Sequence, residues 1–515
     1  MTAQLPLVIR VLNDRLRFRY WGPQRVRRLE TFVVDLADWK LSLTDRTPCI
    51  WIHTSEHLSA LPHDLAEEIR DAVRQQAWQN ETILVCVDGP ADELRRQFTG
   101  SLTQFVVLDD KQQKEIADAP SPTRTMLDSL LSQIPRSQLA PYETSRPVRG
   151  SRFFGRQSHL KKILGHPRTN FLIIGIRRIG KSSLLREVER LLDLSDPPGE
   201  NQRRRLYVDC SVITTPEEFY REIIRRLSPN DMKRLLGRGS QSLRFQSLMF
   251  DYLADRHGGQ ITYLLDEIDR LLEHLGADLS LFDVLRKASF QEGTARFITA
   301  GFRQARRAVN DKDTPFYNFG ETLTLDSLDR PEVKQMVELP MEQLRVKLQG
   351  RDEIVQRIYR ETAGQPNLVQ FYCQTLLEQL DRSGGTTNVI SADDLRWVYE
   401  NANFRDFVLQ TFLANSLPLE RAVVFAMVGA HAGQPGDTFS LKEIDEELER
   451  RGLSANFGTL DEACRNLVTA SILQKSGRQF TFSIPLFARM LEENYPVDYA
   501  FEKTRREIIP AEVSR

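Results

Sequence analysis

The sequence predicts a multidomain α/β protein: a core with a parallel sheet, a helical domain after it, a small α/β domain before it and a compact C-terminal domain. Strands and helices alternate up to about residue 118 and again over 149–325, a pattern typical of parallel sheets. Residues 326–412 carry only helical periodicity. Residues 413–495 read as three helices and a hairpin over 472–484, the parts of a winged helix.

The length and composition fit a protein with several buried cores. The chain has 515 residues, and its 70 Lys and Arg balance 71 Asp and Glu, which argues against a globally basic protein that coats nucleic acid. Its five cysteines show no metal-binding spacing and are expected to be reduced and buried. With no apolar run of about 20 residues and no signal-peptide pattern, we expect a cytoplasmic protein without a membrane partner.

The N-terminal domain, expected over 1–118, is predicted to contain a small parallel sheet with strands at 49–53, 82–87 and 104–108. Asp88, Asp109 and Asp110 follow two of these strands. Solvated turn carboxylates are the favoured interpretation, and a magnesium site at one rim of the sheet is the alternative. The role of this domain is not predicted. Several prolines then mark 119–148 as a linker.

The central domain, expected over 149–325, contains a complete phosphate-binding pattern. Gly175 to Ser182 matches G-x-x-x-x-G-K-[ST], and it lies between an apolar strand (Phe171–Ile174) and a helical pattern (183–192). Backbone amides of such a loop surround a β-phosphate at a helix N-terminus, a lysine adds charge, and a hydroxyl binds Mg²⁺. The residues expected to hold ATP or ADP are therefore Gly175, Ile176, Arg177, Arg178, Ile179, Gly180, Lys181, Ser182 and Ser183, with Ser182 also a metal ligand.

A second motif follows 85 residues after Lys181. The apolar strand at 261–266 ends in Asp266, which is expected to reach Mg²⁺, and Glu267 is expected to polarise the attacking water. Asp269 is expected to cap the next helix.

A further apolar strand, 295–303, ends in Arg303. A cation there could sense the γ-phosphate, which would make Arg303 part of the catalytic set with Lys181, Asp266 and Glu267. Because Arg306 and Arg307 lie nearby, a solvated basic turn is the alternative.

Together these motifs, in one order with Phe153-Phe-Gly-Arg156, Pro340 and Gly364-Gln-Pro366, resemble the STAND class of AAA+-type P-loop ATPases, close to its prokaryotic "archaeal ATPase" branch. The resemblance covers 149–495, including a helical lid (326–412) and a winged helix (413–495), with a tail over 496–515. It implies that Phe154, Gly155 and Arg156 lie beside adenine, that Arg303 is the sensor arginine, and that Pro366 packs on the base. From the residues alone, Phe154 could equally be a core contact, and Pro366 could simply begin a helix.

The function expected from this resemblance is a slowly hydrolysing ATP-dependent switch. Its nucleotide state would control domain opening and self-association into a homo-oligomer, with an unknown protein trigger or effector. The alternative is a DNA-associated AAA+ ATPase that uses the winged helix on duplex DNA. Residues 417–495 contain eight Lys or Arg and eleven Asp or Glu, so nucleic acid binding is possible but not favoured.

Overall fold

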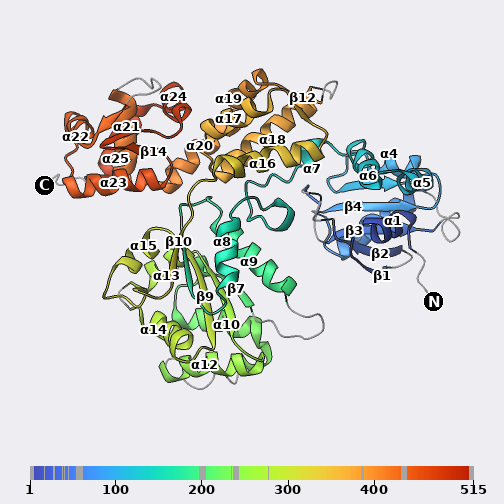
Figure 1. Ribbon diagram of the computed structural model, residues 1–515, viewed down its shortest axis with the longest axis horizontal. Coiled ribbons are helices and arrows are strands. Elements are labelled where there is room, and N and C mark those ends of the chain that lie inside the picture. The colour runs from blue at the N-terminus through green and yellow to red at the C-terminus, as the bar shows by residue number, and fades with distance from the viewer. Residues whose placement is uncertain are drawn as a thin grey trace.

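Four parts follow one another along the chain in the computed structural model of the protein (Figure 1). They are an N-terminal, a central, a helical and a C-terminal domain, and the helical domain lies between the N-terminal and C-terminal ones. The structure describes residues 5–16, 18–26, 29–36, 39, 41–43, 46–53, 62–79, 81–195, 205–232, 235, 243–276, 278–383, 388–430 and 438–509.

The N-terminal domain contains a five-stranded sheet in the order β1-β2-β3-β4-β5. The three predicted strands are β3, β4 and β5, and they are parallel as expected. The sheet is nevertheless mixed, because β1 and β2 add an antiparallel hairpin on one side. The sequence pattern missed β1 because most of its residues are exposed and it contains Gly22 and Pro23, which are typical of an edge strand. The strands are β1 (Tyr20–Val26), β2 (Leu29–Val34), β3 (Thr47–Ile52), β4 (Thr82–Val87) and β5 (Gln104–Leu108).

Helices cover both faces of this sheet. α1, α5 and α6 pack together over one face, and α3 and α4 pack over the other. The helices are α1 (Leu7–Leu16), α3 (Pro62–Gln75), α4 (Asp92–Phe98), α5 (Asp110–Asp118) and α6 (Pro122–Leu131).

The segment between the first two domains runs along the helical domain. It contains α6 and the short α7 (Arg136–Leu139), which packs against α18 of the helical domain. The Asp381 carboxylate accepts hydrogen bonds from the backbone amides of Arg136 and Ser137, at 3.3 and 2.9 Å. The buried Tyr142 donates its hydroxyl to the Met336 carbonyl at 3.2 Å. This segment is therefore fixed by side-chain burial and specific hydrogen bonds.

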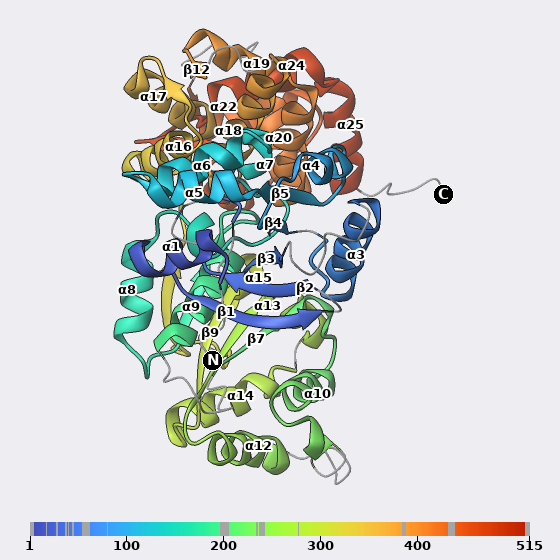
Figure 2. The ribbon, with the colours of Figure 1, turned by 90° about the vertical axis from the view of Figure 1, so that its right-hand side faces the viewer.

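The central domain is built on a five-stranded sheet in the order β10-β6-β9-β8-β7, in which every neighbouring pair is parallel. The inner strands are buried along their whole length, as expected for a parallel sheet covered on both faces. Figure 2 shows α12 and α14 at the end of the molecule farthest from the helical domain. The strands are β6 (Phe171–Ile174), β7 (Arg205–Asp209), β8 (Ile261–Asp266), β9 (Ala295–Gly301) and β10 (Glu321–Thr324). The helices are α8 (Gln157–Gly165), α9 (Lys181–Ser195), α10 (Pro216–Leu227), α12 (Leu243–Arg256), α13 (Ile268–Leu275), α14 (Ser280–Arg286) and α15 (Arg303–Asn310).

The helical domain follows the predicted helical periodicity, with one addition. Two short strands, β11 (Lys347–Leu348) and β12 (Val389–Ile390), pair in parallel. The first helix begins with a capping box formed by Asp329 and Glu332. The helices are α16 (Arg330–Gln343), α17 (Arg351–Thr362), α18 (Pro366–Arg382), α19 (Arg396–Glu400) and α20 (Ala402–Asn415).

The C-terminal domain contains the three predicted helices, α21, α22 and α23, a small antiparallel sheet in the order β13-β15-β14, and two further helices, α24 and α25. α25 lies in the segment expected to be a tail and instead packs against α21, because Ala500, Phe501 and Thr504 are buried. The elements are α21 (Pro418–Ala430), β13 (Phe439–Ser440), α22 (Leu441–Arg450), α23 (Phe457–Thr469), β14 (Leu473–Ser476), β15 (Gln479–Phe482), α24 (Pro485–Asn494) and α25 (Val497–Ile508).

One apolar core connects all four domains. It includes one face of each large sheet, the helical domain and the C-terminal domain, while the other face of each sheet has its own core. In the described residues, no helix has both the length and the apolar character that a membrane crossing requires.

Candidate functional site

The glycine loop lies between β6 and α9, as its sequence predicts. Gly180 has φ +104°, a conformation that side chains rarely adopt. A Cβ atom on Gly175 would lie only 2.8 Å from Cγ2 of Ile179, so the loop needs glycine there too. Lys181 is the first residue of α9, and its Nζ donates hydrogen bonds to the carbonyls of Gly175 and Ile176, at 2.8 and 3.0 Å. The loop therefore folds around the ammonium group.

An open cleft with an empty volume of about 1410 Å³, which includes its opening to solvent, lies over this loop. Its walls carry six basic and two acidic side chains, a charge balance that suits a polyphosphate. Eleven of the predicted site residues line it: Phe154, Arg156, Arg177, Arg178, Ile179, Gly180, Lys181, Ser182, Ser183, Glu267 and Pro366. Those outside the lining are Gly155, Gly175, Ile176, Asp266 and Arg303.

The two acidic residues at the end of β8, Asp266 within the strand and Glu267 after it, differ in their surroundings. Asp266 is buried, with Oδ2 accepting a hydrogen bond from the Tyr207 hydroxyl at 2.7 Å and Oδ1 accepting one from the Glu267 amide at 3.0 Å. Glu267 lines the cleft and has φ +53°. Burial raises the pKa of Glu267, the neighbouring Asp266 raises it further, and Lys181 opposes the shift. A carboxyl group with a raised pKa is suited to accept a proton near neutral pH.

Burial lowers the pKa of Lys181, whereas the negative charges of Glu267 and Asp266 act in the opposite direction. The lysine and the acidic pair thus stabilise one another across the floor of the cleft.

Asp269 caps a helix, but not the next one along the chain. Its carboxylate accepts hydrogen bonds from the amides of Phe302 and Gln304, at 2.5 and 2.7 Å, at the start of α15. The neighbouring strands β8 and β9 are parallel, so the segments that follow them meet at one edge of the sheet. Asp269 lies in the first turn of α13, directly after the acidic pair. It therefore connects the start of α13 to the start of α15, the helix that begins with Arg303.

Arg303 is bound by the C-terminal domain. Its guanidinium forms a bidentate ion pair with Glu420 of α21, with N–O distances of 2.6 and 2.5 Å. The Glu420 side chain is 2% exposed and also accepts hydrogen bonds from the Leu417 amide and from Nδ2 of Asn466, at 2.8 and 3.0 Å. Because Arg303 is paired with Glu420, it is not part of a solvated basic turn, and in this arrangement its guanidinium is not available to a γ-phosphate. Its catalytic role stays a prediction.

The phosphate loop also contacts the end of the helical domain. Nη1 of Arg178 donates a hydrogen bond to the Thr411 hydroxyl of α20 at 2.9 Å, and its guanidinium lies 4.8 Å from the centre of the Phe407 ring. Ile176 is buried and, with Thr411, lines a small apolar pocket between α20 and the C-terminal domain. Two variable positions of the loop, Ile176 and Arg178, thus connect it to the helical and C-terminal domains.

The far end of the cleft joins the N-terminal part of the central domain to the helical domain. The Arg156 amide donates a hydrogen bond to Oε1 of Glu332 at 2.7 Å, and its guanidinium donates to the Asp326 carbonyl. Burial lowers the pKa of Arg156. Pro366 begins α18, which is the conformational role that its sequence context also allowed. It lines the cleft as well, so the two interpretations do not exclude one another.

Sequence reasoning missed one wall of the cleft. Residues 143–148, in the predicted linker, line it together with Asn367 and Gln370. The Val148 amide donates a hydrogen bond to the Ser183 hydroxyl at 3.1 Å, and the Glu143 amide donates to Oε1 of Gln370 at 2.8 Å. The proline-rich composition of this segment carries no signal for such a role.

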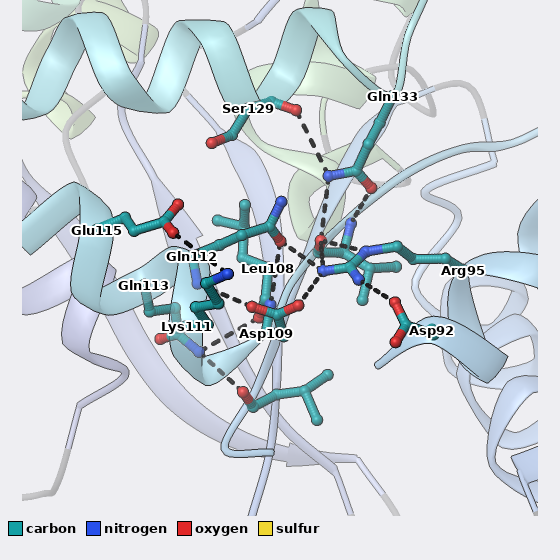
Figure 3. Close-up of polar contacts among 12 residues, drawn as sticks. Asp92, Arg95, Leu108, Asp109, Lys111, Gln112, Gln113, Glu115, Ser129 and Gln133 are labelled. Atoms are coloured by element: carbon teal, nitrogen blue, oxygen red, sulfur yellow. Dashed lines mark hydrogen bonds and ion pairs between the residues drawn. The ribbon is translucent and has the colours of Figure 1, made fainter. Parts of the chain in front are cut away.

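The alternative magnesium site in the N-terminal domain does not form in the described residues, where no group of three His, Cys, Asp or Glu could hold a metal ion. Figure 3 shows Asp109 at the start of α5, facing Arg95. Arg95 donates hydrogen bonds to Asp109 and to Gln112, each at 2.5 Å. Burial alone would raise the pKa of Asp109, but hydrogen bonds from the Gln112 amide and from Arg95 outweigh it and lower the pKa.

Comparison with known proteins supports one part of the chain. Residues 165–308 match the model of a family described as an AAA domain. No curated protein sequence matches the chain.

Similar solved structures include a Walker-type ATPase of Pyrococcus abyssi, 16% identical, which aligns over 68% of this chain and 99% of its own with a TM-score of 0.49. The ORC2 protein of Aeropyrum pernix, in complexes with ADPNP and ADP, is 13% identical over 69% of this chain and 94% of its own, with a TM-score of 0.49. The RuvB Holliday junction branch migration motor of Thermotoga maritima is 17% identical over 66% and 95%, with a TM-score of 0.36. These values add no argument about function.

The parallel sheet, the glycine loop on β6 and the acidic pair on β8 define a P-loop nucleotide-binding fold. The family match to residues 165–308 agrees with this fold and supports an ATPase of the AAA type in the central domain.

Proposed function

We propose that this protein is a slowly hydrolysing, STAND-like ATP-dependent switch, held closed by its C-terminal domain and able to self-associate when open. The observation that carries this proposal is the ion pair between Arg303 and Glu420. It connects the helix that follows the candidate sensor strand to a buried carboxylate 117 residues away in the chain.

The nucleotide would bind with its phosphates on the loop from Gly175 to Ser183 and its base between Phe154, Gly155, Arg156 and Pro366. Lys181 would leave the loop carbonyls and contact the β- and γ-phosphates. Glu267, with its raised pKa, would take the proton of the attacking water.

A magnesium ion fits the oxygen donors at this site. The Ser182 hydroxyl and the Asp266 carboxylate are hard ligands of the type that Mg²⁺ prefers, and Mg²⁺ in phosphate sites keeps most of its waters. Asp266 is buried with two hydrogen bonds, and the described residues provide it with no salt-bridge partner. Bound Mg²⁺ would neutralise charge on the phosphates.

The C-terminal domain is proposed to be a winged helix that serves as a packing module. On its third helix, α23, Asn466 contacts Glu420 and Thr469 contacts Arg306, at 3.0 and 3.3 Å. Glu462 on the same helix lies 3.9 Å from Arg307. These three positions are spaced 4 and 3 residues apart, so one face of α23 is directed at α15 and at the Glu420 carboxylate that pairs with Arg303 of α15. A groove-binding role on DNA would require that face to be released.

Switching would follow from competition for the same groups. Arg303 cannot pair with Glu420 and reach a γ-phosphate at the same time, and Arg178 cannot leave Thr411 without loosening α20. A nucleotide shifts such an equilibrium only by its differential affinity for the closed and open states. The wall at 143–148 would transmit the same change to the N-terminal domain.

A Glu420→Gln variant tests this proposal. It keeps an acceptor for Leu417 but removes the charge that holds Arg303, so we expect the rate of ATP hydrolysis to rise about fivefold or more, a typical coupling magnitude. Hydrogen exchange in α15 and α23 should rise in parallel.

The matched control is Glu462→Gln, which alters an exposed pair in the same interface and should leave both quantities near wild type. Unchanged hydrolysis and exchange in Glu420→Gln would contradict the proposed closing role. Salt-sensitive duplex binding by the wild-type protein would favour the DNA-associated alternative instead.

A further inference from the structure

Tyr207 on β7 contacts Asp266, the last residue of the neighbouring strand β8. Its side chain is buried, and its hydroxyl donates a hydrogen bond to Oδ2 of Asp266 at 2.7 Å. Because Oδ1 of Asp266 accepts a hydrogen bond from the Glu267 amide, both carboxylate oxygens are fixed in direction. An ionised carboxylate can accept about four hydrogen bonds, so each oxygen keeps capacity toward a metal-bound water.

Tyr207 is itself held by the helix that follows the phosphate loop. The Arg186 guanidinium carbon lies 3.3 Å from the centre of the Tyr207 ring, and Nη1 of Arg186 donates a hydrogen bond to Oε2 of Glu189 at 2.9 Å. Ser182 and Arg186 are four residues apart on α9, so they lie on the same face of the helix. Contacts thus run from Arg186, on the same face of α9 as Ser182, to Tyr207 and on to Asp266.

Tyr207 is the donor in this contact. An ionised carboxylate only accepts hydrogen bonds, so the proton between the two groups belongs to the Tyr207 hydroxyl.

We propose that Tyr207 is a positioning residue of the ATPase site, which fixes the Asp266 carboxylate for Mg²⁺. In this proposal, Arg186 fixes the position of the Tyr207 ring relative to Ser182 on the same helix. The inference rests on the proposed nucleotide and metal site. Mg²⁺ demands near-ideal octahedral geometry, and partners of its ligands commonly control its affinity.

The test measures affinity for a fluorescent ATP analogue, once in EDTA and once in Mg²⁺, for the wild type and two hydroxyl deletions. Tyr207→Phe should keep the wild-type affinity in EDTA and lose about tenfold of the affinity in Mg²⁺. The matched control is Tyr263→Phe on the neighbouring strand β8. Its buried hydroxyl has no hydrogen-bond partner among the described residues, and its ring packs on Phe297. Tyr263→Phe should gain as much affinity from Mg²⁺ as the wild type.

A second variant, Arg186→Gln, separates a loss of Mg²⁺ affinity from a loss of folding. The Arg186 side chain is one-third exposed, so its replacement creates no cavity in the core. It should lose affinity in Mg²⁺ in the same direction as Tyr207→Phe but to a smaller extent, with unchanged thermal unfolding. An equal Mg²⁺-dependent gain in Tyr207→Phe and Tyr263→Phe would overturn the inference while leaving the proposed function intact. A wild-type protein that binds no ATP analogue in Mg²⁺ would overturn the proposed function and the inference together.

Discussion

The two large sheets of this protein each place an aspartate immediately after a buried parallel strand, and the two aspartates have different surroundings. Asp109 follows β5, caps α5 and pairs with Arg95 (Figure 3). Asp266 ends β8 and is followed by Glu267, which lines a cleft together with Lys181. The comparison shows that aspartates at the carboxyl ends of parallel strands in two sheets can have opposite surroundings: Asp109 is paired with an arginine, whereas Asp266 accepts hydrogen bonds from a tyrosine hydroxyl and a backbone amide.

The largest expected effect comes from removing Lys181, the lysine of the phosphate loop at the carboxyl edge of the central sheet. Lys181→Ala should weaken ATP binding by about a hundredfold or more, because two charge-assisted hydrogen bonds to phosphate, each worth about 1.5–3 kcal/mol, are lost. A titration with ATP measures this change. The control is Lys161→Ala, an exposed lysine on α8, which should bind like the wild type. Unchanged ATP affinity in Lys181→Ala would show that the glycine loop of the central domain is not the phosphate site.

The next effect concerns turnover. Glu267→Gln should retain ATP binding and reduce the hydrolysis rate by about a hundredfold or more, the magnitude expected for loss of a general base. Glu273→Gln, a half-exposed acid on the following helix, is the matched control. Equal hydrolysis by Glu267→Gln and the wild type would show that Glu267 is not the base.

The same residue sets the expected pH dependence. A base must be deprotonated, and the pKa of Glu267 lies above its ordinary value of 4.5. The hydrolysis rate should therefore fall, as pH is lowered, at a higher pH than for an ordinary glutamate. Glu267→Gln should show none of this dependence in its residual rate.

The smallest expected effect concerns Asp109 in the N-terminal domain. Asp109→Ala should lower the free energy of unfolding by about 1–2 kcal/mol, because a helix cap is lost and Arg95 loses its partner, and should leave ATP affinity unchanged. Asp110→Ala, a more exposed neighbour, should change stability by less than about 0.5 kcal/mol.

Chemical denaturation measures both variants, and it also tests the sign of the pH effect. A folded pKa below the unfolded one stabilises the protein above the unfolded value of about 3.9, and this stabilisation is lost as pH falls toward the folded value. A loss of ATP affinity in Asp109→Ala would indicate that the N-terminal sheet edge is functional after all.

The comparison also shows how much of the site the sequence could predict. The loop from Gly175 to Ser182 was predictable because its fold depends on neighbouring residues, with a strand before it and a helix after it. The strand ending in Asp266 was predictable for the same reason. By contrast, Asp269 caps a helix that begins 34 residues later, and Glu420 lies 117 residues from Arg303. Such pairings depend on which strands and domains are neighbours, which local patterns do not encode.

The N-terminal domain gave the weakest prediction, for a related reason. Its three parallel strands are apolar and were found, whereas β1 is mostly exposed and the more buried β2 joins the sheet through an antiparallel hairpin with β1. The wall at 143–148 became part of the cleft only through contacts with α9 and α18.

The most direct test of the switch is the mass of the wild-type protein, measured by mass photometry without nucleotide, with ADP and with a slowly hydrolysed ATP analogue, all with Mg²⁺. The account predicts a monomer in the first two conditions and a larger assembly with the analogue alone, because only a γ-phosphate would compete with Glu420 for Arg303. A single unchanged mass under all three conditions, in a protein that binds the analogue, would contradict it.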